Sequence, residues 1–263
     1  MTARGDVEFV VSGAESLLRV EALHMSGEAS EFAVRTGPWL RDPVVGVCRG
    51  ALAVPLDDAT GYLIAASSSP DRWPVSMSMR LDFLTDPPTD GSVLQVAGER
   101  LALDHRLGAT RGRVLTQEGD LVALITHRSH LLTVGAPPPA PEGIPEAPGD
   151  TRLREALGVR VAADGVVDLP PSAFAANGMQ NVHGGILVVL AEFAAMTTVG
   201  AEGGYRTTSI DMTYVRPCRA DVTTRFRADL VHRGRSLSVI EVVGEGPDGR
   251  VCVMATVVIQ EEA

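Results

Sequence analysis

Residues 184–196 read Gly-Gly-Ile-Leu-Val-Val-Leu-Ala-Glu-Phe-Ala-Ala-Met, an apolar stretch that two glycines open and that a single charged residue, Glu192, interrupts. Apolar side chains would cover every side of a helix built from it, so we expect a helix over about 184–200 that other elements enclose. The stretch is about as long as a membrane span, but the carboxylate at its middle favours a buried helix of a soluble protein.

An earlier part of the chain resembles this stretch. Residues 50–59 precede residues 185–194 by 135 positions, which aligns Asp57 with Glu192. Residues 78–84 match 209–215 at an offset of 131, and residues 119–126 match 249–256 at an offset of 130. Element-sized matches at a slowly changing offset indicate a duplication. Two copies are too few for a solenoid, so we expect a two-fold pseudo-dimer.

A proline-rich segment separates the two copies. Residues 136–150 hold six Pro and two Gly in fifteen positions, which favours an extended linker over a helix or a central strand. The length of 263 residues fits one domain or two. With the repeat, it predicts an N-terminal domain over 1–135, a linker over 136–150 and a C-terminal domain over 151–263.

Both halves show the same predicted order of elements. A short amphipathic helix (14–23; 152–157) is followed by a strongly apolar helix (about 50–66; about 184–200) and then by strands. Apolar and polar residues alternate over 75–83, 210–214 and 222–230, and a continuous apolar run over 251–259 predicts a central strand buried on both faces. These patterns predict an α+β fold in which an antiparallel sheet wraps the apolar helices.

The composition excludes several classes of function. A net charge of -10 gives no general attraction for nucleic acid or for an anionic membrane. The three cysteines are far apart and lack the spacing of a zinc site or a disulfide framework. The N-terminal residues lack the basic start and apolar core of a signal peptide, so we expect a cytoplasmic protein.

The chemistry begins with Glu192, because an unpaired carboxylate in an apolar helix costs several kcal/mol. Gly184 and Gly185 leave backbone N–H groups accessible at the helix start, where they can polarise a carbonyl. A nearby carboxylate can activate water or attack directly, and together these groups suit acyl transfer to water. The alternative is a structural role, in which Glu192 pairs with an arginine at the helix edge.

The segment Asn177-Gly-Met-Gln-Asn-Val-His183-Gly184-Gly185, followed by Glu192, resembles the active-site signature of PaaI-like hotdog-fold acyl-CoA thioesterases. That signature has an Asn six residues before His-Gly-Gly and an acid nine residues after the His. Residues 214–217, Tyr-Val-Arg-Pro, resemble the family's strand end after the helix. The resemblance covers about 85 residues of the second half. With the repeat, it implies two tandem hotdog domains that form an intramolecular pseudo-dimer.

The resemblance also implies roles for single residues. The N–H of Gly184 would polarise the thioester carbonyl, and Asn177 would orient the carbonyl or the water. His183 would shape the helix entrance. The acid would act as general base or nucleophile, and a hydroxyl on the following strand, from Ser76 or Ser209, would position the water.

In a hotdog dimer the acid comes from the other copy, which implies two unequal sites in this chain. The first would combine Asn177, His183 and Gly184 with Asp57 and Ser76. The second would combine Glu192 and Ser209 with Asp42, Cys48, Arg49 and Gly50. In the second, a carboxylate at Asp42 would repel a developing oxyanion, so we expect the first site to be the active one. If the acid came from the same copy, Glu192 would be the catalyst instead.

The implied reaction is hydrolysis of an acyl-CoA or acyl-carrier-protein thioester without a metal or cofactor. Gly185, Arg216 and Arg219 are the candidates for substrate binding, because arginines suit the phosphates of CoA. Two alternatives remain: a non-catalytic acyl-CoA-binding protein, and a hotdog dehydratase or hydratase. By analogy, two such chains would associate as a homodimer.

Overall fold

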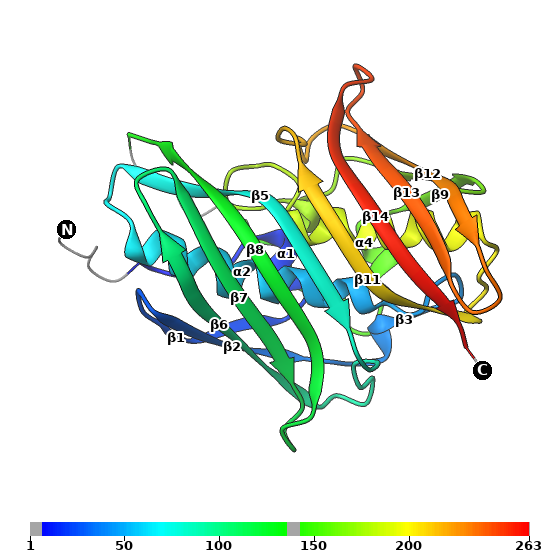
Figure 1. Cartoon of the computed structure of the whole chain (residues 1–263), viewed down its shortest axis with the longest axis horizontal. Helices are drawn as coiled ribbons and strands as arrows, with labels where there is room; N and C mark the ends of the chain where they lie inside the picture. Colours follow the sequence, from blue (N-terminus) through cyan, green and yellow to red (C-terminus); the bar gives the residue numbers. More distant parts are fainter. Residues whose placement is uncertain (1–6, 136–142, 263) are drawn as a thin grey trace.

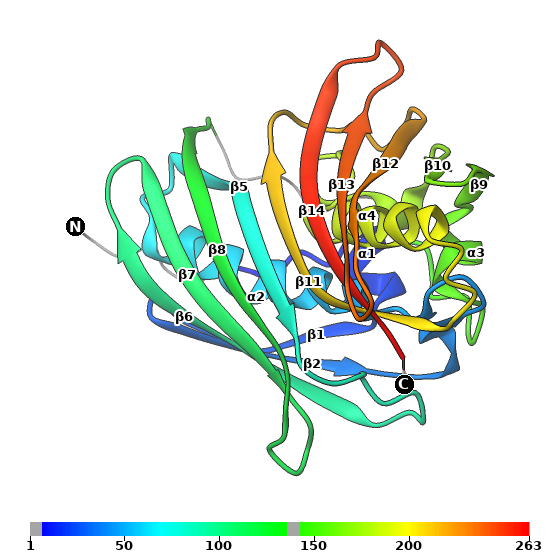
Figure 2. The same cartoon turned by 45° about the vertical axis from the view of Figure 1, so that its right-hand side comes forward.

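The computed structural model describes residues 7–135 and 143–262 and shows one large antiparallel sheet that curves around two helices (Figures 1 and 2). The helices are α1 (Gly13–Leu17), α2 (Ala53–Ser67), α3 (Leu153–Leu157) and α4 (Gly184–Thr198), with short 3-10 helices η1 (Pro38–Leu40), η2 (Arg49–Leu52) and η3 (Ala173–Ala175). The strands of the first half are β1 (Val20–Met25), β2 (Ala29–Arg35), β3 (Arg41–Asp42), β4 (Gly46–Val47), β5 (Arg72–Phe83), β6 (Val93–Leu103), β7 (Leu107–Leu115) and β8 (Leu121–Thr133). Those of the second half are β9 (Arg160–Ala163), β10 (Val166–Leu169), β11 (Tyr205–Tyr214), β12 (Thr224–Arg233), β13 (Ser238–Glu245) and β14 (Val251–Glu261).

The order of strands in the sheet is symmetric about its centre. The 12-stranded sheet runs β1-β2-β6-β7-β8-β5-β11-β14-β13-β12-β10-β9, so each half contributes six consecutive strands. The halves join where β5 pairs antiparallel with β11, with Leu81 opposite Ile210 and Met79 opposite Met212. Figure 1 shows α2 behind the strands of the first half and α4 behind those of the second. The structure therefore confirms the predicted α+β fold and pseudo-dimer.

The two central helices pack against each other as well as against the sheet. A side chain at Gly185 would place its Cβ 2.4 Å from the backbone nitrogen of Val54, so α4 starts in close contact with α2. The residues of α4 from Gly185 to Thr197 are all buried, as its apolar sequence predicts.

The prediction of a helix over 14–23 is wrong in its second part. Helix α1 ends at Leu17, and Arg19 has a positive φ of 56°, a conformation that a helix cannot continue. Residues from Val20 onward form β1, which pairs with β2 at one edge of the sheet.

The apolar run over 251–259 also differs from its prediction. It forms β14 near the centre of the sheet, but only one face is buried, and Met254 is 52% exposed. An antiparallel sheet needs one buried face only, which the prediction did not allow for.

The predicted linker lies partly outside the described residues, namely at 136–142. Residues 143–150 carry no helix or strand. Within the described part of the chain, no helix is both long and apolar enough to cross a membrane.

Candidate active site

A cavity of about 510 Å³ lies between the two halves of the chain. Helix α2 and strands β5 and β8 of the first half form one side of it. Val10 and Glu15 also line it, as do the second-half residues Asn177, Gly178, Met179, Asn181, Val182, His183, Gly184, Leu187 and 214–218. Five residues predicted for the first site, Asp57, Ser76, Asn177, His183 and Gly184, all line this cavity.

Asp57 is a carboxylate of the first half that lines the cavity. Its side chain is 12% exposed, on α2 of the first half. Ser76 of β5 donates a hydrogen bond from Oγ to Asp57 Oδ1 over 3.2 Å. Nδ1 of His183, from the second half, lies 3.5 Å from Asp57 Oδ2. Hence the acid of one half faces the helix start of the other half.

The start of α4 presents a backbone donor beside this acid. His183 is the N-cap residue, and its Nδ1 accepts the N–H of Gly185 over 3.0 Å. Among the described residues, none accepts a hydrogen bond from the N–H of Gly184. A Cβ at Gly184 would lie 2.6 Å from Asp57 Oδ2, so only glycine leaves room for the acid here. The Tyr214 hydroxyl donates to the carbonyl of Gly184 over 3.0 Å.

Asn177 shapes the loop that precedes α4. Its Oδ1 accepts the backbone N–H groups of Met179 over 2.9 Å and of Asn181 over 3.1 Å. Because the side-chain oxygen is used within the loop, its amide NH₂ is the group left for a ligand in the cavity.

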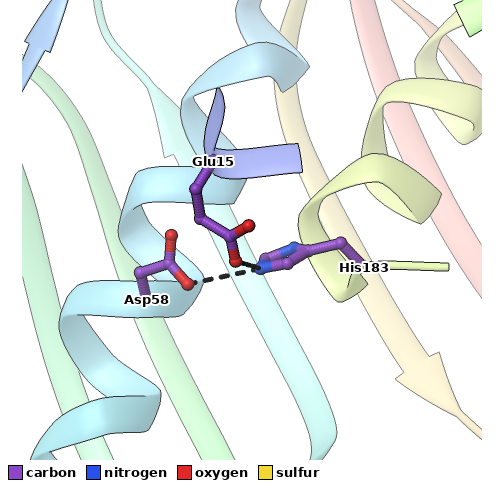
Figure 3. A group of neighbouring side chains, drawn as sticks. All are labelled: Glu15, Asp58 and His183. Atoms are coloured by element: carbon purple, nitrogen blue, oxygen red, sulfur yellow. Dashed lines mark hydrogen bonds and ion pairs between the residues drawn. The ribbon is translucent and has the colours of Figure 1, made fainter. Parts of the chain in front are cut away.

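Two further acids at the site were not predicted from the sequence. Nε2 of His183 lies 3.4 Å from Glu15 Oε1 and 3.3 Å from Asp58 Oδ1. Figure 3 shows both acidic side chains pointing toward this histidine. Glu15 comes from α1 and Asp58 from α2, and both are buried. One ligand-type atom from each of Glu15, Asp58 and His183 lies within 4.8 Å of the others, so these are the residues of the cavity that could approach a metal ion. The Ser-x-x-Glu spacing of residues 12–15 was the available sequence signal for Glu15.

The second predicted site is closed to solvent, because Glu192 is 0% exposed. Both of its carboxyl oxygens accept hydrogen bonds from protein groups. Oε2 accepts the N–H of Gly50 over 2.9 Å and the thiol of Cys48 over 3.1 Å. Oε1 accepts the hydroxyl of Thr207 over 2.6 Å. Burial raises the pKa of Glu192, and these three hydrogen bonds oppose the rise. Glu192 thus contacts the opposite half, as Asp57 does. Unlike Asp57, it occupies the donors that a substrate would need in the second site.

The remaining residues of the second site also pair with protein groups. Burial and the charge of Glu192 raise the pKa of Cys48 well above its usual value, so Cys48 keeps the proton it donates. Arg49 bonds Asp86 over 2.6 Å and the carbonyl of Thr207 over 2.9 Å. Asp42 forms an ion pair with Arg154 over 2.8 Å.

Thr207, not Ser209, supplies the hydroxyl beside Glu192. Ser209 instead pairs along the sheet with Asp82 and Val258. The offset of 131 between the two strands places Thr207 opposite Ser76 in the repeat, so the correct residue was available from the sequence.

The three substrate-binding candidates separate in the structure. Arg216 lines the cavity mouth with residues 214–218. Arg219 is exposed and bonds Asp221 over 2.8 Å from Nε. Gly185 does not line the cavity but serves the contact between α4 and α2.

Comparison with known proteins finds thioesterases of similar fold. Residues 173–260 match the family model of the acyl-CoA thioesterase N-terminal domain. A candidate thioesterase from Novosphingobium aromaticivorans is similar in structure at a TM-score of 0.68 and 15% identity, over 92% of this chain and 98% of that one. The acyl-CoA thioesterase II TesB2 of Mycobacterium marinum has a TM-score of 0.62 and 12% identity, over 95% and 96%. The 12:0-ACP thioesterase of Umbellularia californica has a TM-score of 0.62 and 14% identity, over 89% and 94%.

No curated protein matches the sequence. At such low identities the structural likeness shows the fold, and it confirms the double-hotdog architecture expected from the repeat. The second half is thus similar to the acyl-CoA thioesterase domain over residues 173–260, and the whole chain has the fold of solved thioesterases.

Proposed function

We propose that the chain hydrolyses an acyl-CoA or acyl-carrier-protein thioester in the cavity between its halves, with Asp57 as the catalytic carboxylate. The observation that carries the proposal is the position of Asp57. It lies within 3.5 Å of His183 and directly beside Gly184, both from the other half, in the wall of a 510 Å³ cavity. A thioester carbonyl placed there meets a free backbone N–H and a carboxylate together.

The reaction then follows from these groups. Asp57 accepts a proton from a water that Ser76 helps to hold, and the water oxygen bonds to the carbonyl carbon. The N–H of Gly184 stabilises the negative charge on the carbonyl oxygen. The carbon–sulfur bond breaks, and the leaving thiolate takes the proton from Asp57. Direct attack by Asp57 would give an acyl anhydride that water hydrolyses, and it requires the same neighbours.

The second pseudo-site does not serve as a catalyst in this proposal. Glu192 is fully buried, and the N–H of Gly50, which would have to face a carbonyl, is already bonded to Glu192. A substrate would have to displace three hydrogen bonds before it reached the acid.

Several finer assignments belong to the same proposal. We place the chain in the PaaI-like group because of the segment from Asn177 to Gly185. The two hotdog domains would span 1–135 and 151–263, with 136–150 as their linker. Arg216 at the cavity mouth would meet a phosphate of CoA. Three free, buried cysteines suit a cytoplasmic location.

A thiol-release assay with DTNB tests the proposal. The purified chain should release CoA thiol from at least one member of an acyl-CoA series of increasing chain length. If no acyl-CoA or acyl-carrier-protein substrate yields thiol, hydrolysis is refuted. Thermal stabilisation by the same acyl-CoA without thiol release would establish the non-catalytic binding protein instead.

A further inference from the structure

Three buried side chains from three separate elements meet at the base of the cavity: Glu15, Asp58 and His183 (Figure 3). Both acids approach the same nitrogen of His183, Nε2, at 3.4 Å and 3.3 Å. The reaction scheme above uses neither acid. An apolar interior does not retain two carboxyl groups without a compensating interaction, so their arrangement around Nε2 requires an explanation.

Glu15 is fixed in place from the opposite direction. Its Oε2 accepts the backbone N–H of Ser12 over 2.9 Å, and the hydroxyl of Ser12 donates to the carbonyl of Ala176 over 2.9 Å. A Cβ at Gly13 would lie 1.7 Å from the carbonyl oxygen of Ala173, so α1 is pressed against the second half. Helix α1 thus fixes the Glu15 side chain, so that its Oε1 lies beside His183 of the other half.

The hydrogen bond at the other ring nitrogen of His183 decides where its proton lies. Nδ1 accepts the N–H of Gly185, so Nδ1 must present a lone pair. The proton of the neutral ring is then on Nε2, between the two acids. Burial lowers the pKa of His183, whereas the hydrogen bonds and charges of Asp58 and Glu15 raise it well above its usual value. Because Nδ1 already accepts the N–H of Gly185, the proton that these acids favour is the one on Nε2. A metal ion would need the lone pair of Nε2 and would force the proton onto Nδ1, against the N–H of Gly185. The hydrogen bonding therefore favours a proton over a metal ion between these residues.

The charges of the two acids fit this assignment. Burial and the charge of Glu15 raise the pKa of Asp58 to about 7. Oδ2 of Asp58 is buried without a hydrogen-bond partner in the described structure. An unpartnered oxygen is less costly on a neutral carboxyl group than on a carboxylate. Asp58 therefore keeps a proton near neutral pH. Of the two acids beside Nε2–H, Glu15 is then the charged acceptor.

We propose that Glu15 and Asp58 are positioning residues that hold His183 as its Nε2–H tautomer, so that Nδ1 caps Gly185 and the neighbouring Gly184 N–H stays free for the thioester carbonyl. The catalytic consequence rests on the proposed function. The tautomer itself depends only on the three side chains and the start of α4.

The variant Glu15→Gln tests the catalytic consequence. Its amide oxygen is needed to accept the backbone N–H of Ser12, so its amide NH₂ faces Nε2, demands a lone pair there and opposes the native tautomer. We expect kcat to fall about tenfold in Glu15→Gln with KM changed less than about threefold, because the cap supports the developing oxyanion rather than substrate binding. The matched control Glu99→Gln, from an exposed ion pair with Arg111, should retain wild-type kcat. An unchanged kcat in Glu15→Gln would overturn the catalytic role.

Nitrogen-15 NMR of the histidine rings tests the tautomer directly, without any substrate. The signal of His183 is identified by its loss in His183→Asn. We expect a protonated Nε2 and an unprotonated Nδ1 in the wild type, and a shift toward the Nδ1–H form in Glu15→Gln. A wild-type ring protonated on Nδ1, or stoichiometric Zn²⁺ binding that displaces these signals, would overturn the proposal. The expected tautomer in a chain without thioesterase activity would refute the proposed function alone.

Discussion

Replacing Glu192 tests whether this acid has a structural role rather than a catalytic one. Glu192→Gln should leave the free energy of unfolding near neutral pH within about 1 kcal/mol of wild type, or raise it. The amide oxygen can accept the N–H of Gly50, and the amide NH₂ can donate to the hydroxyl oxygen of Thr207. Every polar neighbour then keeps a partner, and a buried ionisable group is removed.

Glu192→Ala should be far more damaging. It removes the acceptor of the Gly50 N–H, the Thr207 hydroxyl and the Cys48 thiol at once. An orphaned buried donor costs about 1–3 kcal/mol, and the lost methylene and carboxyl volume adds a cavity cost. Because such effects are not additive, we expect a total loss of about 3–5 kcal/mol.

The pH dependence gives a second measure of the same residue. Burial raises the pKa of Glu192 in the folded state above its unfolded value of 4.5. The stabilisation linked to this protonation is complete below pH 4.5 and is lost as the pH rises through the folded pKa. Relative to wild type, Glu192→Gln should therefore gain stability as the pH rises above 4.5.

Urea denaturation of the three proteins at several pH values measures these differences. The reasoning fails if Glu192→Gln is as unstable as Glu192→Ala at neutral pH. It also fails if the difference between Glu192→Gln and wild type does not change with pH.

Three other substitutions are predicted from single contacts. Gly13→Ala places a Cβ 1.7 Å from the carbonyl of Ala173 and should cost about 2–3 kcal/mol, seen as a lower Tm; an unchanged Tm would contradict the contact between α1 and the second half. Ser76→Ala removes the hydroxyl 3.2 Å from Asp57 and should lower kcat about tenfold in the thiol-release assay; a wild-type kcat would remove Ser76 from the mechanism. Arg216→Ala should raise KM for acyl-CoA about tenfold with little change in kcat, whereas an unchanged KM would place the CoA phosphates elsewhere.

The sequence predicted those features that depend on local pattern and on the repeat. The apolar run of α4 predicted an enclosed helix, and the alignment of Asp57 with Glu192 predicted equivalent places in two halves. The offset of 135 also predicts that the two acids occupy equivalent positions. In the structure, Asp57 contacts His183 at the start of α4, and Glu192 accepts the N–H of Gly50 in η2, just before α2.

Three residues that complete the two sites were missed, namely Glu15, Asp58 and Thr207. Glu15 lies 168 positions before His183 in the sequence, and only the packing of α1 on η3 brings them together. Asp58 follows Asp57 directly, and successive residues of a helix point in different directions, so the role of one does not predict the role of the other. The partner of Asp58, His183, lies in the other half, where no sequence pattern links it to Asp58. Thr207 aligns with Ser76 at the strand offset of 131, so the repeat already identifies it, whereas the prediction named Ser209 two residues later on the same strand.

The central claim is that Asp57, and not Glu192, carries out the chemistry, and a comparison of two conservative variants in the thiol-release assay tests it most directly. Asp57→Asn should lower kcat by about 100-fold to 10,000-fold, because the amide can neither accept the proton of water nor attack. Glu192→Gln should keep kcat within about threefold of wild type, because its hydrogen bonds are preserved. An inactive Glu192→Gln beside a fully active Asp57→Asn would contradict the account.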